Sequence, residues 1–197
     1  MPVRRREEEE VRMPNSGRTC VLLHGWKGSP GHMEPLGRYL HQQGFSVWIP
    51  FLGSKAQDDT WLHDLGRLRT PPVLIGFSRG GLLALKAAIS TAICGLVTIN
   101  TPLDFGEEMD LPPAWRQELL RIRSLLARVT APALIVQSVD DTVIDPGNGQ
   151  LIYDLIGSCS KELWSCRGDH LVILRAGRQE LFAKVATFAI GLRSVCR

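Results

Sequence analysis

The sequence predicts an α/β fold: a compact, doubly wound and mainly parallel β-sheet of about six strands. Apolar runs alternate with segments of helical period along most of the 197 residues. The runs are mostly continuous instead of alternating with polar residues, as strands covered on both faces require. They lie at residues 19–23, 45–49, 73–75, 93–99, 133–136 and, with a weaker pattern, 162–166.

Helical segments are expected between these runs, at residues 31–43, 60–68, 80–90, 113–128, 147–156 and 177–192. The segment 80–90 is apolar nearly all round, which is typical of a helix packed under a sheet. In 113–128, Trp115, Leu119 and Ile122 fall on one stripe, and most of the arginines lie off it as a solvated face. In such folds, ligand sites lie outside the carboxyl ends of the strands. Catalytic residues are therefore expected just after strands.

Composition and net charge limit the kinds of partner that the protein is expected to bind. The net charge is only +3 and the arginines are spread along the chain, so neither nucleic acid nor an anionic membrane is indicated. No apolar stretch is long enough to span a bilayer. The five cysteines are odd in number and form no C-x-x-C motif, which favours a reducing compartment. We expect a cytoplasmic protein that binds a small molecule and needs no metal or cofactor.

The first 17 residues are expected to lie outside the fold. Basic residues 4–6 are followed by acidic residues 7–10, with no apolar run behind them. This pattern is neither a secretory signal nor an anchor, and it predicts a disordered tail or, alternatively, a short interaction arm. Residues 18–197 are then one domain of ordinary size.

A nucleophile elbow is predicted at residues 76–80, which read Gly-Phe-Ser-Arg-Gly with Ser78 at the centre. A serine on a sharp strand-to-helix turn has strained backbone angles, and side chains two positions away would collide with neighbouring elements. Gly76 and Gly80 remove those side chains. A glycine-rich turn with a surface serine is the alternative, but the apolar strand before it and the apolar helix after it favour the elbow.

An activated serine needs a histidine base and a carboxylate that orients it. His170 follows the last strand run, and His24 follows the first. The other histidines lie in helix or loop patterns where a surface imidazole is expected: His32, His41 and His63. Three candidate acids follow the strand run 133–136: Asp140, Asp141 and Asp145.

Oxyanion donors are expected from two backbone N–H groups. The pair His24-Gly25 ends the first strand, where the following loop can turn an N–H toward a bound carbonyl group. We assign this role to the N–H of Trp26 and to that of Arg79, the residue after the serine. A simple glycine turn is the alternative for His24-Gly25, and its position relative to Ser78 favours the oxyanion loop.

These motifs together resemble the α/β-hydrolase superfamily, and within it the small bacterial carboxylesterases and monoacylglycerol-lipase-like serine hydrolases. The resemblance covers nearly the whole chain after residue 18 and is carried by residues 21–26, 36–40, 58–61, 76–81, 135–146 and 168–170. It implies the triad order serine, acid, histidine. In that family the acid lies five residues before the proline of its loop, which selects Asp141.

The chain also departs from that family. No antiparallel hairpin precedes the first strand, which predicts a truncated core. The cap over the site is reduced to a short segment, about residues 103–128. Its apolar side chains, Phe105 and Met109 foremost, are expected to roof the acyl pocket.

The sequence therefore predicts a serine hydrolase that cleaves carboxylic esters through an acyl-enzyme, with Ser78, Asp141 and His170 as the catalytic residues. Thioesterase and acyltransferase activities use the same triad and stay open. A non-catalytic homologue that holds a hydrophobic ligand in the same pocket is the alternative from another class.

Overall fold

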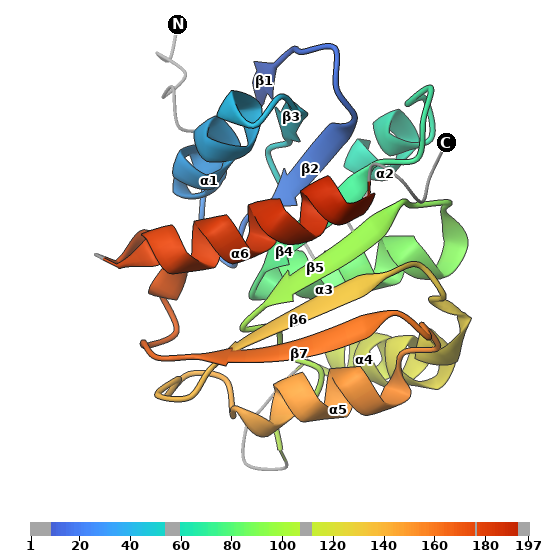
Figure 1. Ribbon diagram of the computed structural model, residues 1–197. Coiled ribbons are helices and arrows are strands. Elements are labelled where there is room, and N and C mark those ends of the chain that lie inside the picture. The colour runs from blue at the N-terminus through green and yellow to red at the C-terminus, as the bar shows by residue number, and fades with distance from the viewer. Residues whose placement is uncertain (1–8, 54–59, 107–111, 176, 193–197) are drawn as a thin grey trace, which may run out of the picture.

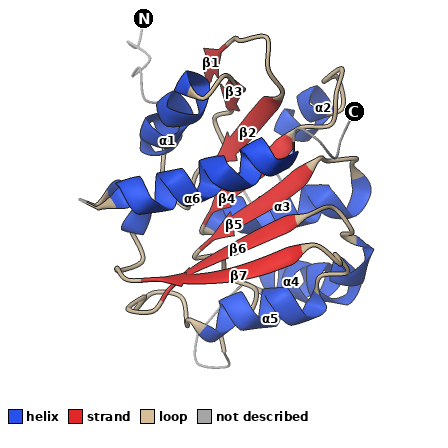
Figure 2. Cartoon of the chain, viewed as in Figure 1, coloured by secondary structure: helices blue, strands red, loops and turns tan. Residues whose placement is uncertain are grey.

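A computed structural model describes residues 9–53, 60–106, 112–175 and 177–192. Its centre is a seven-stranded sheet with the order β1-β3-β2-β4-β5-β6-β7. Neighbouring strands are parallel, except that β1 pairs antiparallel with β3 (Figure 2). The strands are β1 Val11–Met13, β2 Thr19–Leu23, β3 Ser46–Ile49, β4 Val73–Phe77, β5 Gly95–Ile99, β6 Ala133–Ser138 and β7 Lys161–Cys166.

Helices cover both faces of the sheet, as the continuous apolar strand runs predict (Figure 1). Helices α1 and α6 pack on one face, where the rings of Tyr39 and Phe182 lie 5.9 Å apart. Helices α2, α3, α4 and α5 supply apolar side chains to the core on the other face. The helices are α1 Pro30–Gln42, α2 Thr60–Leu65, α3 Arg79–Ser90, α4 Pro113–Leu125, α5 Gly147–Leu155 and α6 Arg178–Gly191.

The amino-terminal expectation requires a correction. The sequence predicts a disordered tail over residues 1–17, whereas Val11–Met13 forms β1, which pairs with β3. Trp48 of β3 contacts this strand and the residue before it. The Trp48 indole N–H donates to Glu10 at 2.9 Å, and the Arg12 guanidinium lies 4.8 Å from the Trp48 ring centroid. Residues 1–8 lie outside the described part of the chain.

Helix α4 packs into the core and also forms an ion pair with α3. Leu119 and Ile122 are buried in the core, as the apolar stripe predicts. Glu118 pairs with Lys86 of α3 at 3.2 Å, which ties the middle of α4 to that helix. Helix α4, which belongs to the segment expected to form a cap, therefore packs into the helical layer beside the sheet.

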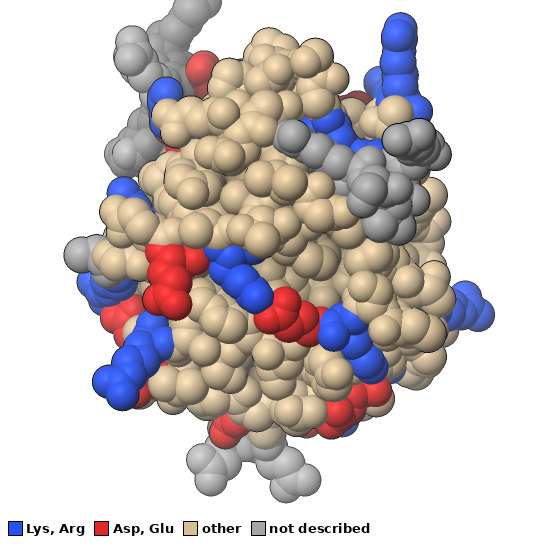
Figure 3. Space-filling model, viewed as in Figure 1, with Lys and Arg blue, Asp and Glu red and all other residues tan. Residues whose placement is uncertain are grey.

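The surface carries mixed charge. Figure 3 shows acidic and basic side chains interspersed on the face that carries α6. Lys184 of α6 and Glu162 of β7 form one such ion pair across neighbouring elements, at 2.5 Å. In the described ranges, no helix is both long enough and apolar enough to cross a membrane.

Candidate active site

Ser78 sits on a strained turn between β4 and α3. Its φ of 53° and ψ of −122° lie outside the regions that ordinary residues occupy. A side chain at Gly76 would collide with the backbone of Gly80, and one at Gly80 with the backbone of Leu23. The Ser78 N–H donates to the Ile99 carbonyl of β5 at 2.8 Å. The turn thus has the geometry of a nucleophile elbow, with Ser78 at the carboxyl edge of the sheet.

His170 lies in the loop after β7 and meets the serine. Its Nε2 atom is 3.1 Å from Ser78 Oγ, and its Nδ1 atom is 2.8 Å from Asp141 Oδ2. Because an ionised carboxylate only accepts hydrogen bonds, Nδ1 carries the proton and donates it to Asp141. Nε2 is then the acceptor for the serine hydroxyl. This tautomer is the one that a general base for Ser78 requires.

The three candidate aspartates have different surroundings. Asp141 is fully shielded, and its Oδ1 accepts the N–H groups of Val143 and Ile144, each at 2.9 Å. These two bonds leave Oδ2 aimed at the imidazole. Asp140 is exposed and accepts the N–H of Gly168 at 3.2 Å. Asp145 accepts the N–H of Gly147 at the start of α5, at 2.6 Å. Among these three carboxylates, Asp141 is the one that accepts the hydrogen bond from the imidazole of His170.

His24 is buried at the end of β2 but does not join the triad. Its Nδ1 lies 3.0 Å from the Gly25 carbonyl, and its Nε2 accepts the N–H of Leu52 at 3.0 Å. Burial lowers its pKa to about 4, because the charged form loses hydration. A neutral His24 thereby ties the loop after β2 to the loop after β3.

A cavity of about 520 Å³ opens beside Ser78 and His170. Its size suits a small organic ligand, and its walls are mainly apolar. Several elements supply these walls, with Phe77, Leu82, Phe105, Trp115, Ile144 and Leu171 among the lining side chains. Phe105 is thus where the sequence places it. Met109, the other expected roof residue, lies outside the described residues.

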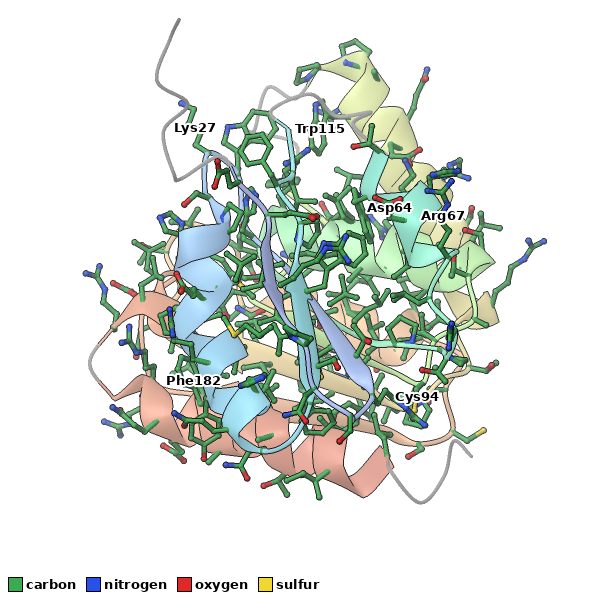
Figure 4. The ribbon with its side chains drawn as sticks, turned by 90° about the horizontal axis from the view of Figure 1, so that it is seen from above. Lys27, Asp64, Arg67, Cys94, Trp115 and Phe182 are labelled. Atoms are coloured by element: carbon green, nitrogen blue, oxygen red, sulfur yellow. The ribbon has the colours of Figure 1, made fainter. Side chains whose placement is uncertain are left out.

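The two residues assigned as oxyanion donors also border this cavity. The Arg79 guanidinium lies 5.6 Å from the Trp26 ring centroid, so the side chains of the two residues are in contact. Arg79 begins α3, and N–H groups in a first turn point out of the helix at its N-terminal end. Figure 4 shows Trp115 and Lys27, the residue after Trp26, at the same end of the molecule.

Asn100 lies close to the triad although no sequence motif marks it. It follows β5 directly and is fully buried. Its side-chain amide donates to the backbone carbonyl of His170 at 3.0 Å. The signal that could have found it is a polar residue directly after a buried strand, at the sheet edge where ligand sites lie.

No metal centre is found in the part of the chain that the structure describes, where no three histidine, cysteine, aspartate or glutamate side chains gather suitably. No disulfide joins the cysteines in the described ranges, of which Cys20 and Cys94 are buried.

The chain is similar in sequence to a known protein family and to known enzymes. A model of the alpha/beta hydrolase family matches residues 20–189. A thermostable monoacylglycerol lipase of Bacillus sp. (strain H-257) is 30% identical over 77% of this chain and 82% of its own length. A carboxylesterase of Bacillus subtilis (strain 168) is 20% identical over 87% of this chain and 92% of its own.

Solved structures agree on the fold. One chain from a study of two metagenome-derived lipolytic enzymes superposes with a TM-score of 0.82 at 23% identity, covering 94% of this chain and 98% of that one. The monoacylglycerol lipase of Paleococcus ferrophilus gives a TM-score of 0.77 at 15% identity, covering 93% and 99%. The similarity therefore extends over nearly the full length of both structures.

Proposed function

Because the chain belongs to the alpha/beta hydrolase family, we propose that it is a carboxylic-ester hydrolase with Ser78 as its nucleophile. The observation that carries the proposal is the hydrogen-bonded series from Ser78 through His170 to Asp141, at the mouth of an apolar cavity. A serine, a base and an orienting acid in this order are what acyl transfer requires.

The reaction proceeds in two halves. As Ser78 Oγ attacks the ester carbonyl carbon, His170 Nε2 takes the hydroxyl proton, and Asp141 stabilises the imidazolium. The N–H groups of Trp26 and Arg79 stabilise the negative oxygen of the tetrahedral intermediate. The C–O bond to the alcohol breaks, and His170 returns the proton to that leaving oxygen. Water, deprotonated by His170, then attacks the acyl carbon. The bond to Ser78 Oγ breaks, His170 returns the proton to this oxygen, and the carboxylic acid is released.

The walls of the cavity support an apolar acyl or alcohol group as the part of the substrate that binds. Burying apolar surface there stabilises the complex in proportion to the area removed from water. The names of the relatives agree with this substrate class, since one is a monoacylglycerol lipase and another a carboxylesterase. We therefore propose simple carboxylic esters or acylglycerols as substrates.

A fluorophosphonate probe tests the proposal, because it labels only a serine that a neighbouring base activates. The wild-type protein should be labelled and should hydrolyse p-nitrophenyl butyrate, and Ser78→Ala should lose both properties. Ser124→Ala is the control, since Ser124 is exposed on α4 and its hydroxyl donates to the Arg121 carbonyl. Labelling that survives in Ser78→Ala would rule out this nucleophile.

Turnover assays with other acyl donors and acceptors distinguish ester hydrolysis from the alternative functions. A thioesterase would prefer the butyryl thioester of a small thiol over the oxygen ester of matched size. An acyltransferase would deliver the butyryl group to an added alcohol in preference to water. A non-catalytic ligand-binding protein would show neither labelling nor turnover.

A further inference from the structure

A single buried amide joins three strand ends at the active-site edge of the sheet. Asn100 follows β5, and its Nδ2 donates to Ser138 Oγ at 2.9 Å and to the His170 carbonyl at 3.0 Å. A longer contact of 3.4 Å reaches the Asp169 carbonyl. Its Oδ1 accepts the backbone N–H of Ser138 at 2.8 Å. The side chain thus makes bonds to β6 and to the loop after β7 at the same time.

The chemistry of these partners fixes the orientation of the amide. A backbone N–H can only donate, so the atom facing the N–H of Ser138 is the oxygen. A backbone carbonyl can only accept, so the atom facing the carbonyl of His170 is the NH₂ group. Rotation of the amide by 180° would place its NH₂ group against the N–H of Ser138 and its oxygen against the carbonyl of His170. Both contacts would then be unfavourable in a fully buried place. Asn100 therefore has one satisfied arrangement.

The partners of Asn100 belong to the segments that carry the triad. Ser138 ends β6, three residues before Asp141. His170 is itself the base. The carbonyl of Ile99, the preceding residue, accepts the N–H of Ser78 at 2.8 Å. The Ile99-Asn100 pair is thus the point at which the nucleophile, acid and base segments are held together.

The backbone of Asn100 fits this role. Its φ is 46°, in the left-handed region that asparagine tolerates better than most residues with a side chain. This conformation follows directly on the end of β5. Aspartate and glycine also suit this backbone, so they are the substitutions that test the side chain without adding strain.

We propose that Asn100 is a positioning residue for ester hydrolysis, which holds the Asp141 and His170 segments in register with Ser78. The proposal rests on the hydrolase function proposed above. Asn100 is not among the residues that line the described cavity, so it acts through the triad and not through substrate contact. Misplacement of a catalytic group by about 1 Å can lower a rate by about 100-fold. Loss of Asn100 should therefore reduce kcat and leave KM nearly unchanged.

Asn100→Asp is the sharpest variant. It keeps the oxygen that accepts the N–H of Ser138 and replaces the donor that faces the His170 carbonyl. Asn148→Asp is a matched control, because Asn148 is also buried and donates to two backbone carbonyls, those of Asp104 and Asp145 at 2.9 and 3.0 Å. Its Oδ1 likewise accepts a backbone N–H, from Leu103 at 2.7 Å. Asn148 contacts none of the three triad residues through these bonds.

Both variants and the wild type would be compared by kcat and KM on p-nitrophenyl butyrate and by thermal unfolding. Asn100→Asp should lose about ten- to 100-fold in kcat with KM within about twofold. Asn148→Asp should lose a similar amount of stability and keep kcat within about twofold. The proton NMR signal of His170 Nδ1–H, downfield of the amide region, should shift or broaden in Asn100→Asp alone. If that variant does not fold, Asn100→Gly takes its place.

Equal kcat losses in the two variants, or an unchanged kcat in a folded Asn100 variant, would overturn the positioning role. These outcomes are distinct from a failure of the proposed function, which would leave the wild type without esterase activity. In that case the NMR signal alone decides: an identical His170 resonance in the wild type and the Asn100 variant would also overturn the role.

Discussion

The indole rings of Trp26 and Trp115 pack against each other with their centroids 5.3 Å apart and their planes tilted by 58°. Trp26 lies in the loop after β2 that is proposed to supply an oxyanion donor, and Trp115 lies in the first turn of α4. Both side chains line the cavity beside Ser78. The pair therefore connects the carboxyl edge of the sheet to α4, which belongs to the segment that was expected to act as a cap.

Trp115→Ala should widen the cavity and extend the range of acyl chains accepted. Core packing of α4 depends on Leu119 and Ile122, which are buried, so the helix should stay folded. We expect kcat/KM for p-nitrophenyl laurate to rise relative to that for the butyrate. Leu120→Ala is the control, because Leu120 is exposed on the same helix. An unchanged ratio in Trp115→Ala would show that this ring does not limit chain length.

The wild-type protein should prefer short to medium acyl chains. Each methylene that is buried contributes about 0.8 kcal/mol, or roughly fourfold in kcat/KM, until the cavity is filled. A cavity of about 520 Å³ has room for only part of a long chain. We expect kcat/KM for p-nitrophenyl esters to rise from acetate and level off at medium length, with no jump at the micelle concentration. A steady rise up to palmitate would contradict this limit.

Asp141→Asn should lower kcat by about 10⁴-fold, because an amide facing His170 Nδ1 favours the wrong tautomer. Asp140→Asn should change kcat by less than about threefold, since Asp140 accepts only the N–H of Gly168 among the bonds described for it. Steady-state kinetics of the two variants, with circular dichroism to check folding, provide the measurement. Equal losses would mean that the acid has been assigned wrongly.

Stability should fall in mild acid because of His24. Burial lowers the pKa of His24 in the folded protein to about 4, below the value of 6.5 of an unperturbed histidine. At pH 7 His24 is neutral in both states. Between pH 6.5 and 4 the unfolded state binds a proton that the folded state does not bind, so stability is lost across this window and levels off below it.

The loss amounts to about 3 kcal/mol at most. Urea unfolding at pH 7, 5.5 and 4.5 would measure the free energy of unfolding of the wild type and of His24→Gln. The difference between the two proteins should shrink as pH falls, because only the wild type carries this titration. A difference that stays constant over the series would show that His24 does not titrate in this way.

Five of the six parallel strands, β2 to β6, could be predicted because they are largely buried and are therefore continuous apolar runs. The pattern of β7 is weaker, because Glu162 and Ser165 are exposed on this edge strand. Strand β1 could not be predicted, because Val11–Met13 is three residues long and contains an arginine. It pairs with β3 and contacts Trp48, and contacts between residues so distant in sequence leave no local pattern. The expected tail was wrong at these residues for this reason.

The residues of the candidate site that lie in a short sequence motif could be predicted. Ser78 is marked by the glycines on either side and by the strand before it. Spacing alone left three aspartates open, because the choice depends on the N–H groups of Val143 and Ile144 that orient Asp141. Asn100 was missed because its role depends on Ser138 and His170, which only the folded sheet brings to it.

Hydrolysis should pass through a butyryl ester on Ser78, which mass spectrometry of the trapped intermediate detects. The protein would be mixed with p-nitrophenyl butyrate, quenched in acid within milliseconds and digested with trypsin. Cleavage at Arg69 and Arg79 releases a peptide of residues 70–79, in which Ser78 is the only serine. This peptide should gain one butyryl group, and the gain should be absent in Ser78→Ala. An unmodified peptide during rapid turnover, or a butyryl group on another residue that survives in Ser78→Ala, would contradict it.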